Sequence, residues 1–273
     1  MEYLKYVISD FERINSPDAT CETMGYSLIP LVLFFFAFAA GIICTVVFLT
    51  KRQAKVTVDI VLRKSLASVL FIITGAFALI IQVILLGYVQ TNLHVFSLLY
   101  IIIGLCFGML GDIWLDLKYV YKPGEKRFLN AGFLSFLIGH LFYSTFLFWF
   151  SDFYLTSVMV FIAGFIAVAV FTATTEKLLK VKYGEFKKIT VIYMGVLGGT
   201  LALSGYNAFV IQRTIFIIFF IGMIFFIASD ALLAGIYFGN DEKARTSRTS
   251  IVLNHALYYT AQYMIALSIF FYV

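Results

Sequence analysis

Residues 26–50 read YSLIPLVLFFFAFAAGIICTVVFLT, a run without a single charged side chain. A helix that spans a bilayer needs about 20 mostly apolar residues, so this stretch predicts a transmembrane helix. Seven similar runs follow along the chain, at 65–89, 93–117, 128–150, 154–174, 190–208, 213–238 and 250–273. The sequence therefore predicts an all-α, polytopic membrane protein with eight transmembrane helices.

The composition supports the same class. Of the 273 residues, 62% are hydrophobic and 13% are charged, whereas soluble domains carry roughly 45–50% apolar and about 25% charged residues. This excludes a soluble globular protein, because its surface would lack charge. The three cysteines are an odd number without paired spacing, so they predict neither a disulfide framework nor a metal site.

Residues 1–25 form a polar N-terminal extension without the apolar core of a signal peptide. This segment is interpreted as either a short amphipathic surface helix or a tail. The remainder, 26–273, is expected to form a single eight-helix transmembrane domain.

The basic residues predict an orientation in the membrane. The four loops at 51–64, 118–127, 175–189 and 239–249 hold 17 of the 20 lysines and arginines. The positive-inside rule places these loops in the cytoplasm and both chain termini outside. Because topology explains the net charge of +5, we expect no nucleic-acid partner.

An internal duplication divides the chain into halves at about 26–150 and 154–273. The matched positions are Gly104 with Gly222, Phe107 with Phe225, Gly111 with Ser229, Asp112 with Asp230, Leu115 with Leu233, His140 with His255, Tyr143 with Tyr258, and Thr145 with Thr260. Each half has four helices, an even number, so both insert in the same direction. The sequence predicts two parallel four-helix repeats about an axis along the membrane normal.

The predicted spans contain three acidic residues, Asp112, Asp116 and Asp230. A carboxylate costs roughly 2.5–3.5 kcal/mol near the bilayer centre, so Asp112 and Asp230 should face a cavity or a protein partner. Asp116 lies nearer the interface, where we expect water to solvate it. Since His140 and His255 fall at similar depths, the two aspartates and two histidines are expected to share one polar site.

The last helix carries further polar side chains, and His255, Tyr259 and Gln262 lie on one face at spacing i, i+4, i+7. No phosphate-binding loop, nucleophile elbow or zinc-protease motif occurs in the sequence. Two alternatives stay open at this point. The duplicated bundle with buried acids could be a proton-coupled transporter of small molecules or lipids. The two histidines and two aspartates could also serve a zinc-dependent intramembrane lipid hydrolase.

Four segments carry a family resemblance: GLCFGMLGDIWL at 104–115, FLNAGFLSFLIGHLFYSTFLF at 128–148, GMIFFIASDALLA at 222–234 and ALYYTAQYMIALS at 256–268. Together they resemble the YhhN family of membrane proteins, whose characterised members are lysoplasmalogenases. The resemblance runs from about Lys64 to the C-terminus. It implies that the paired acidic positions of the family fall on Asp112 and Asp230.

The resemblance implies a membrane-embedded hydrolase that cleaves the vinyl ether bond of lysoplasmalogens to a fatty aldehyde and a glycerophospho-base. No cofactor or metal is expected. Its catalytic carboxyl groups would be Asp112 and Asp230, one as acid and one as carboxylate. The expected supporting and substrate-binding residues are His140, Tyr143, Ser229, His255, Tyr258, Tyr259, Gln262 and Lys64.

The implied partners are a lysophospholipid substrate and the surrounding membrane lipid. The headgroup is expected at the cytoplasmic interface, where Arg63, Lys64 or Lys118 would meet its phosphate and Trp114 or Tyr119 an ammonium group. The implied location is the inner membrane if the source is bacterial and the endoplasmic reticulum if it is eukaryotic.

Overall fold

The computed structural model describes residues 21–52, 56–87, 93–151, 154–178, 181–240 and 246–272. Most of the predicted extension at 1–25 thus lies outside the described residues. Within the described ranges the long helices are α2 (Cys21–Lys51), α3 (Val58–Gly87), α4 (Leu98–Val120), α5 (Glu125–Trp149), α6 (Tyr154–Leu178), α7 (Lys187–Ile211), α8 (Thr214–Phe238) and α10 (Arg248–Ser268). They match the eight predicted spans in number and order, which confirms the all-α fold.

Seven of these helices are long and apolar enough to cross a membrane, and α10 is the exception. It carries Asn254, His255 and Gln262 among its buried side chains. Its place in the bundle explains how they are tolerated, because α10 packs against both α8 and α3. The chain is therefore an integral membrane protein in which the most polar helix is enclosed by apolar ones.

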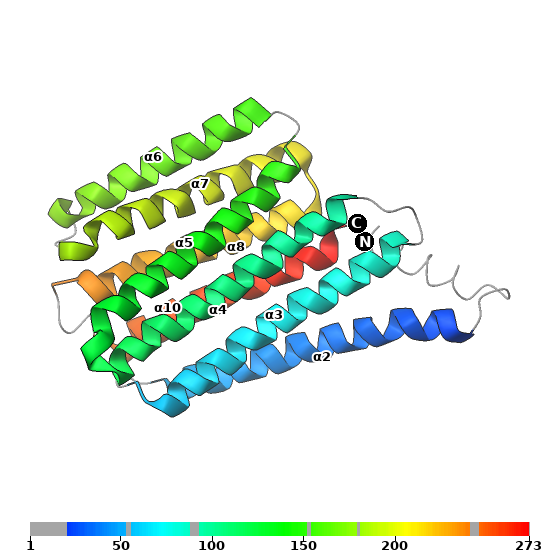
Figure 1. Ribbon diagram of the computed structural model, residues 1–273, viewed down its shortest axis with the longest axis horizontal. Helices are drawn as coiled ribbons and strands as arrows, with labels where there is room; N and C mark the ends of the chain where they lie inside the picture. The colour runs from blue at the N-terminus through cyan, green and yellow to red at the C-terminus, as the bar shows by residue number, and fades with distance from the viewer. Residues whose placement is uncertain are drawn as a thin grey trace.

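The packing of the helices follows the predicted duplication (Figure 1). Consecutive helices pack together within α2–α5, and the same neighbours recur within α6, α7, α8 and α10. The halves meet through α5 on α7 and through α10 on α3, so the fourth helix of each half lies against the second helix of the other. The first helices, α2 and α6, run in the same direction at opposite edges of the bundle (Figure 1).

Two amides join the halves reciprocally. Gln82 on α3 donates a hydrogen bond of 2.7 Å to the backbone oxygen of Phe270, just after α10. Asn207 on α7 donates one of 2.9 Å to the backbone oxygen of Leu147, near the end of α5. A helix leaves its last carbonyl groups without intrahelical partners. Each half therefore satisfies a terminal carbonyl on the fourth helix of the other.

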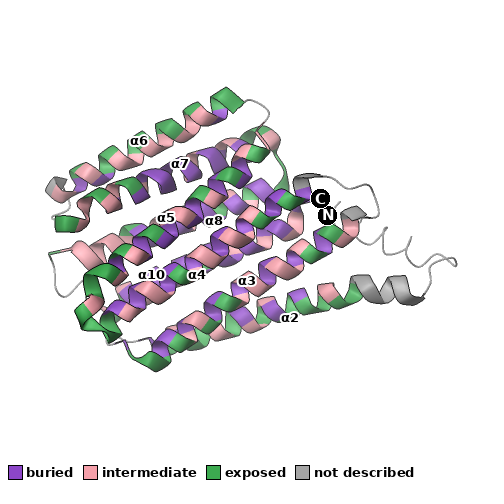
Figure 2. Ribbon diagram, viewed as in Figure 1, coloured by how far each residue is buried: buried purple, intermediate pink, exposed green. Residues whose placement is uncertain are grey.

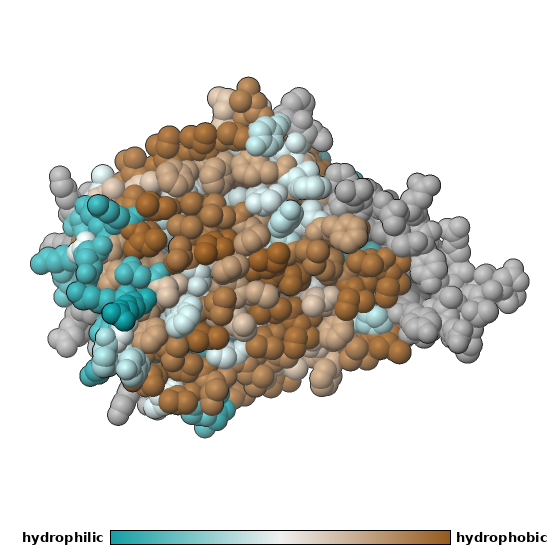
Figure 3. All heavy atoms as spheres, viewed as in Figure 1, coloured by the Kyte–Doolittle hydropathy of each residue, from teal (hydrophilic) through white to brown (hydrophobic). Residues whose placement is uncertain are grey.

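The loops rich in basic residues gather at one end of the bundle, here called the basic end (Figure 3). It consists of the connections α2–α3, α4–α5, α6–α7 and α8–α10. Lys126, in the first turn of α5, and Glu185, in the α6–α7 connection, form an ion pair of 2.7 Å. Arg248 donates a hydrogen bond to the backbone oxygen of Thr50, which links α10 to α2. The ends of the described helices that flank the basic loops thus lie on one side of the bundle, and the cytoplasmic placement of this side stays a prediction.

Small residues let α6 pack closely on α7, although α6 is otherwise largely exposed (Figure 2). A Cβ atom added at Gly198 on α7 would lie 2.5 Å from Cβ of Val168 and 2.8 Å from the backbone oxygen of Gly164. We expect Gly198→Ala to push the two helices apart and to destabilise the protein by about 1–3 kcal/mol, the usual cost of overpacking. Thermal unfolding in detergent measures this change.

Gly235→Ala on α8 is the matched control, because nothing lies within 4 Å of the added methyl group. Alanine is favoured over glycine in a helix by about 1 kcal/mol, so this variant should unfold at the wild-type temperature or slightly above it. Equal unfolding temperatures for both variants would contradict the close α6–α7 contact.

Candidate functional site

Asp112 on α4 is held by two side chains that lie one turn apart on α3. The hydroxyl of Ser68 donates a 2.7 Å hydrogen bond to Oδ2 of Asp112. Nζ of Lys64 lies 3.2 Å from Oδ1. Lys64 and Asp112 are each 3% exposed, so this is a buried ion pair reinforced by a hydroxyl.

Asp116 extends this ion pair toward the basic end. Its Oδ2 lies 3.5 Å from Nζ of Lys64, and its Oδ1 lies 3.8 Å from a guanidinium nitrogen of Arg52. Asp116 is only 1% exposed, so the expectation that water solvates it is wrong. The carboxylate lies beside two cations that the α2–α3 connection and α3 supply.

Helix α10 joins this cluster through Tyr259. Its hydroxyl donates a 3.0 Å hydrogen bond to the backbone oxygen of Lys64 and lies 3.0 Å from the hydroxyl of Ser68. Tyr259 therefore fixes the segment of α3 that holds Asp112.

A second chain of hydrogen bonds crosses from α5 through α10 to α4. Tyr143 donates to Oε1 of Gln262 at 3.1 Å, and Nε2 of Gln262 donates to the hydroxyl of Tyr258 at 2.9 Å. Tyr258 in turn donates to the backbone oxygen of Gly108 at 3.2 Å. A Cβ atom on Gly108 would overlap with Nε2 of Gln262, so glycine makes room for this network.

Asp230 on α8 has a different environment. It accepts a hydrogen bond from the hydroxyl of Tyr193 on α7. It also lines a small cavity whose other walls are Phe133, Thr190, Tyr193, Met194, Leu233, Ala234, Tyr237 and Phe238. Within the described residues, the recorded contacts of this carboxyl group include no lysine or arginine. Asp230 is thus a buried acid that faces a hydroxyl and mainly apolar groups.

The hydroxyl donors occupy equivalent places in the two halves. Ser68 and Gln82 have the same separation along α3 as Tyr193 and Asn207 have along α7. On each second helix one residue binds the aspartate of its own half and the other reaches the opposite half. By this register Lys64 corresponds to Ile189. Each second helix therefore supplies a hydroxyl that binds the aspartate of its half, but only α3 also supplies a lysine.

The remaining predicted site residues do not converge on one point. His255 accepts a 3.2 Å hydrogen bond from Nε of Arg52. His140 lies among Tyr143, Tyr193 and Phe226, with ring centroids 4.6–5.9 Å apart, and its ring nitrogens have no hydrogen-bond partner among the described residues. The structure therefore does not bring the two histidines together.

Ser229 supports the backbone beside Asp230. Its side chain and backbone oxygens both accept hydrogen bonds from the amide of Asn254, at 3.0 and 2.7 Å. These bonds tie α8 to α10. The structure thus gives Ser229 a packing role next to the acid.

The ring of Phe136 lies near the surroundings of both aspartates. A Cβ atom on Gly111 would lie 2.6 Å from the ring of Phe136, and that ring lies 6.3 Å from the ring of Tyr193. Gly111 precedes Asp112, while Tyr193 binds Asp230. No recorded hydrogen bond or ion pair of the described residues joins the two carboxyl groups directly.

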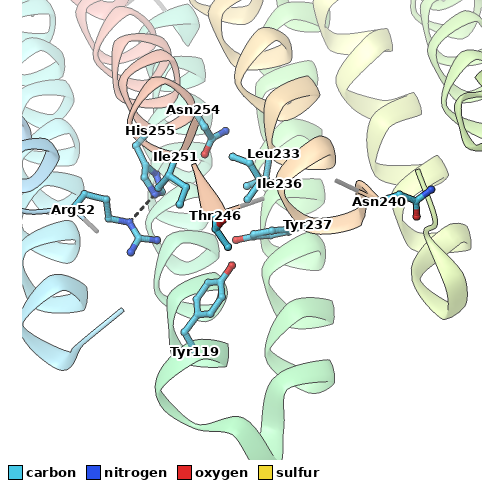
Figure 4. A pocket seen from close by; sticks show the side chains of 10 residues that line it. All are labelled: Arg52, Tyr119, Leu233, Ile236, Tyr237, Asn240, Thr246, Ile251, Asn254 and His255. Carbon is cyan, nitrogen blue, oxygen red and sulfur yellow. Dashed lines mark hydrogen bonds between the residues drawn. The ribbon is translucent and has the colours of Figure 1, made fainter. Parts of the chain in front are cut away.

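A cavity of about 440 Å³ opens at the basic end, next to both aspartate clusters. Its walls are Arg52, Tyr119, Leu233, Ile236, Tyr237, Asn240, Thr246, Ile251, Asn254 and His255. Figure 4 shows the guanidinium group of Arg52 and the hydroxyls of Tyr119 and Tyr237 directed into one shared space. Leu233 and Tyr237 also line the small cavity at Asp230, so the two spaces adjoin.

The residues expected to meet a headgroup have diverse surroundings. Lys64 is engaged with two aspartates, and Arg63 pairs with Asp59 on the exposed face of α3. Trp114 stacks on Phe128 at 5.8 Å. Of the five expected residues, Tyr119 lines the large cavity at the basic end. Lys118 is a neighbour of that cavity, because its Nζ lies 3.3 Å from the ring centroid of Tyr237.

Metal coordination requires ligands that converge. Within the described part of the chain, no three histidine, cysteine or acidic side chains are grouped as a metal ion would need. The separate partners of His255, Asp112 and Asp230 explain this. The arrangement therefore gives the zinc alternative no support.

Sequence reasoning missed Arg52, Ser68 and Tyr193. An alignment of the second helix of each half would have paired Ser68 with Tyr193 through their common spacing to Gln82 and Asn207. Arg52 lies in a basic connection that the topology explains fully, so nothing in its immediate sequence marks it.

Comparison with protein families gives a match to the YhhN family over residues 64–269. The matched region includes both aspartate clusters and begins after Arg52. Comparisons with curated proteins and with solved structures gave no match.

The buried ion pair at Lys64 predicts a large loss of stability when the lysine is removed. In Lys64→Met the carboxylates of Asp112 and Asp116 lose their shared cation, and breaking a buried pair costs about 3–5 kcal/mol. We expect a correspondingly lower unfolding temperature in detergent. Adding Asp112→Asn should recover part of the loss, because it removes one uncompensated charge.

Arg63→Met is the control for this experiment, since it removes a cation from an exposed pair one residue earlier on the same helix. It should leave the unfolding temperature nearly unchanged. A loss for Lys64→Met no greater than that of the control would show that the buried pair contributes little.

Proposed function

The chain belongs to the YhhN family, and from this premise we propose that it is a membrane-embedded hydrolase of the vinyl ether bond of lysoplasmalogens. Asp112 and Asp230 are its catalytic carboxyl groups. The products are a fatty aldehyde and a glycerophospho-base. The substrate enters from the membrane or from the interface at the basic end, which we assign to the cytoplasmic side, with both chain termini outside.

The chemistry of a vinyl ether fits this pair of acids. A carboxyl group transfers its proton to the β-carbon, and the double bond becomes an oxocarbenium ion. A carboxylate stabilises this positive charge and accepts a proton from the water that attacks it, which gives a hemiacetal. The hemiacetal collapses to the aldehyde and releases the glycerol oxygen as an alcohol. Two carboxyl groups divide the work in the same way in glycosidases.

The observation that carries the proposal is the pair of fully buried aspartates, one in each half, each held by a hydroxyl from the second helix of its own half. Acids inside a membrane protein are costly and commonly functional. Their closeness to a cavity that opens at the basic end gives a lipid with a polar head a place to dock.

The side chains that contact Asp112 and Asp230 suggest different roles for the two acids. Asp112 pairs with Lys64, and a neighbouring cation stabilises the ionised carboxylate. Asp230 has a tyrosine hydroxyl and apolar neighbours, where an unpaired charge would be expensive and the neutral acid is the stable form. We therefore assign proton donation to Asp230 and stabilisation of the cation to Asp112.

The position of Phe136 bears on the same chemistry. Its ring lies near both Gly111, next to Asp112, and Tyr193, the partner of Asp230. A vinyl ether that contacts both carboxyl groups would therefore lie close to this ring. Aromatic faces attract cations, so the ring can also help to stabilise the oxocarbenium ion.

A transporter remains the alternative from another class, and the polar residues away from the basic end argue against it. A carrier needs a polar path to both faces of the membrane. Gln82 and Asn207, which lie toward the opposite end, are both engaged with backbone carbonyls of the neighbouring half. Two cavities with charged walls lie at the basic end, where a pocket for a lipid headgroup would open.

We expect Asp112→Asn and Asp230→Asn each to lower aldehyde release from lysoplasmalogen by at least about 100-fold, since acid–base groups commonly contribute 10²–10⁴ in rate. Asp59→Asn, an exposed aspartate at the start of α3, should retain the wild-type rate. The assay uses purified protein with lysoplasmalogen and, separately, an ester lysophospholipid, and quantifies aldehyde and fatty acid. Near-normal turnover in either asparagine variant, or release of fatty acid alone, would refute the proposal.

Infrared spectroscopy tests the assignment of roles without requiring turnover. At neutral pH, protein labelled with isotopic aspartate should show the carbonyl stretch of a protonated carboxyl group. The band should disappear in Asp230→Asn and persist in Asp112→Asn. The opposite pattern would reverse the assignment of donor and carboxylate.

A further inference from the structure

We propose that the cavity of about 440 Å³ at the basic end binds the phosphate of a lysophospholipid headgroup, with Arg52 as its principal ligand. The identity of the lipid in this inference rests on the proposed function. The inference adds where the headgroup binds and which residue recognises its phosphate. Ligand sites commonly measure about 300–1,000 Å³, so the cavity is large enough for a phosphate and its alcohol.

The walls of the cavity suit an anion. They include the guanidinium of Arg52, the amide of Asn240, and the hydroxyls of Tyr119 and Tyr237. None of the lining residues is acidic. The walls therefore combine one guanidinium with neutral side chains that can donate hydrogen bonds, a combination suited to a phosphate diester.

Arg52 is held in place for this role. It is 4% exposed, and its Nε is fixed by the hydrogen bond to Nε2 of His255. Its guanidinium also lies 3.8 Å from Oδ1 of Asp116. The planar guanidinium can offer two parallel N–H groups to a phosphate, a geometry that lysine cannot reproduce. Figure 4 shows it at the edge of the shared space, opposite the tyrosine hydroxyls.

A second positive charge flanks the same space. Nζ of Lys118 lies 3.3 Å from the ring centroid of Tyr237, and Tyr237 is a wall of the cavity. Lys118 also lines the adjoining cavity formed with the α6–α7 connection. Arg52 and Lys118 thus place positive charge on two sides of this space.

The location of the cavity also suits the proposed reaction. Through Leu233 and Tyr237 it adjoins the small cavity at Asp230. Through Arg52, Asp116 and Lys64 it is linked to Asp112. In a lysoplasmalogen a three-carbon glycerol unit separates the phosphate from the vinyl ether. A phosphate at Arg52 would thus leave the vinyl ether to extend deeper, toward the two carboxyl groups.

Arg52 precedes the region that matches the family, which begins at residue 64. The aspartates lie inside that region. The contact that selects a phosphate headgroup is therefore contributed by a segment outside the shared family region, whereas the proposed chemistry is inside it.

Binding of two non-hydrolysable lipids to the purified full-length protein tests the site. The first is a saturated 1-O-alkyl lysophosphocholine and the second is the 1-O-alkylglycerol with the same chain and no phosphate. We expect the phospholipid to bind at least about tenfold more tightly, which corresponds to about 1.4 kcal/mol, because hydrogen bonds between a guanidinium and a phosphate are charge-assisted. Equal affinity for the two lipids in the wild-type protein would overturn the proposal.

Substitutions test whether the preference for the lysophosphocholine over the alkylglycerol depends on the cavity. Arg52→Gln should lose most of the preference for phosphate while binding the alkylglycerol normally, and Arg52→Lys should keep part of it. Tyr119→Glu places a carboxylate in the cavity from a partly exposed position and should also abolish the preference, so the test does not depend on Arg52→Gln folding. Lys126→Gln removes an exposed cation of the basic end and should leave the preference intact. An unchanged preference in both cavity variants would overturn the proposal.

Inorganic phosphate separates a lipid site from a site for a soluble anion. Displacement of the lysophosphocholine only at phosphate concentrations far above its own dissociation constant supports the lipid site. Tight binding of inorganic phosphate together with equal affinity for the two lipids would overturn it. Neither lipid has a vinyl ether, so their binding can be measured independently of turnover. If the preference for the phospholipid depends on Arg52 but the protein releases no aldehyde from lysoplasmalogen, the binding site is supported and the proposed hydrolase activity is refuted. Aldehyde release without that preference would refute the site alone.

Discussion

A carboxyl group buried inside a membrane protein is stable only with a cation beside it or with its proton retained, because an isolated charge in an apolar medium is costly. The two halves of this bundle satisfy that requirement differently. In the first, Lys64 on α3 lies against Asp112 and Asp116. In the second, Asp230 meets the hydroxyl of Tyr193. The pairing of α3 with α4, the buried charges at the basic end and the proposed difference between the two acids all depend on this constraint.

Helix α4 is the element around which these contacts are assembled. Its glycines remove the side chains that would otherwise keep neighbours away: Gly104 lies against Tyr143, Gly108 against Gln262 and Gly111 against Phe136. Two of these neighbours come from α5 and one from α10. Close approach lets the hydrogen bonds between Tyr143, Gln262 and Tyr258 form inside the bundle, where no water is needed to satisfy them.

The helices could be predicted because a span needs only a long apolar run, and even the polar α10 is identifiable through its match to the fourth helix of the first half. The aspartates stand out because charged residues are rare in such runs. Their partners do not: Ser68 and Tyr193 share only a hydroxyl group and lie in otherwise apolar runs. Depth alone also places Asp116 in water, because it does not show the two cations that reach this residue. Which groups meet depends on the rotation of each helix about its axis, and apolar composition does not specify that rotation.

The reciprocal bonds of Gln82 and Asn207 make the two halves depend on each other. Each amide completes the end of a helix that belongs to the other half, so neither half is complete alone. A single four-helix unit with such an amide would leave its own final carbonyl unsatisfied until a second copy supplied the bond. This reciprocity is the relation between two subunits of a symmetric homodimer, here held within one chain in which only the first half has the lysine.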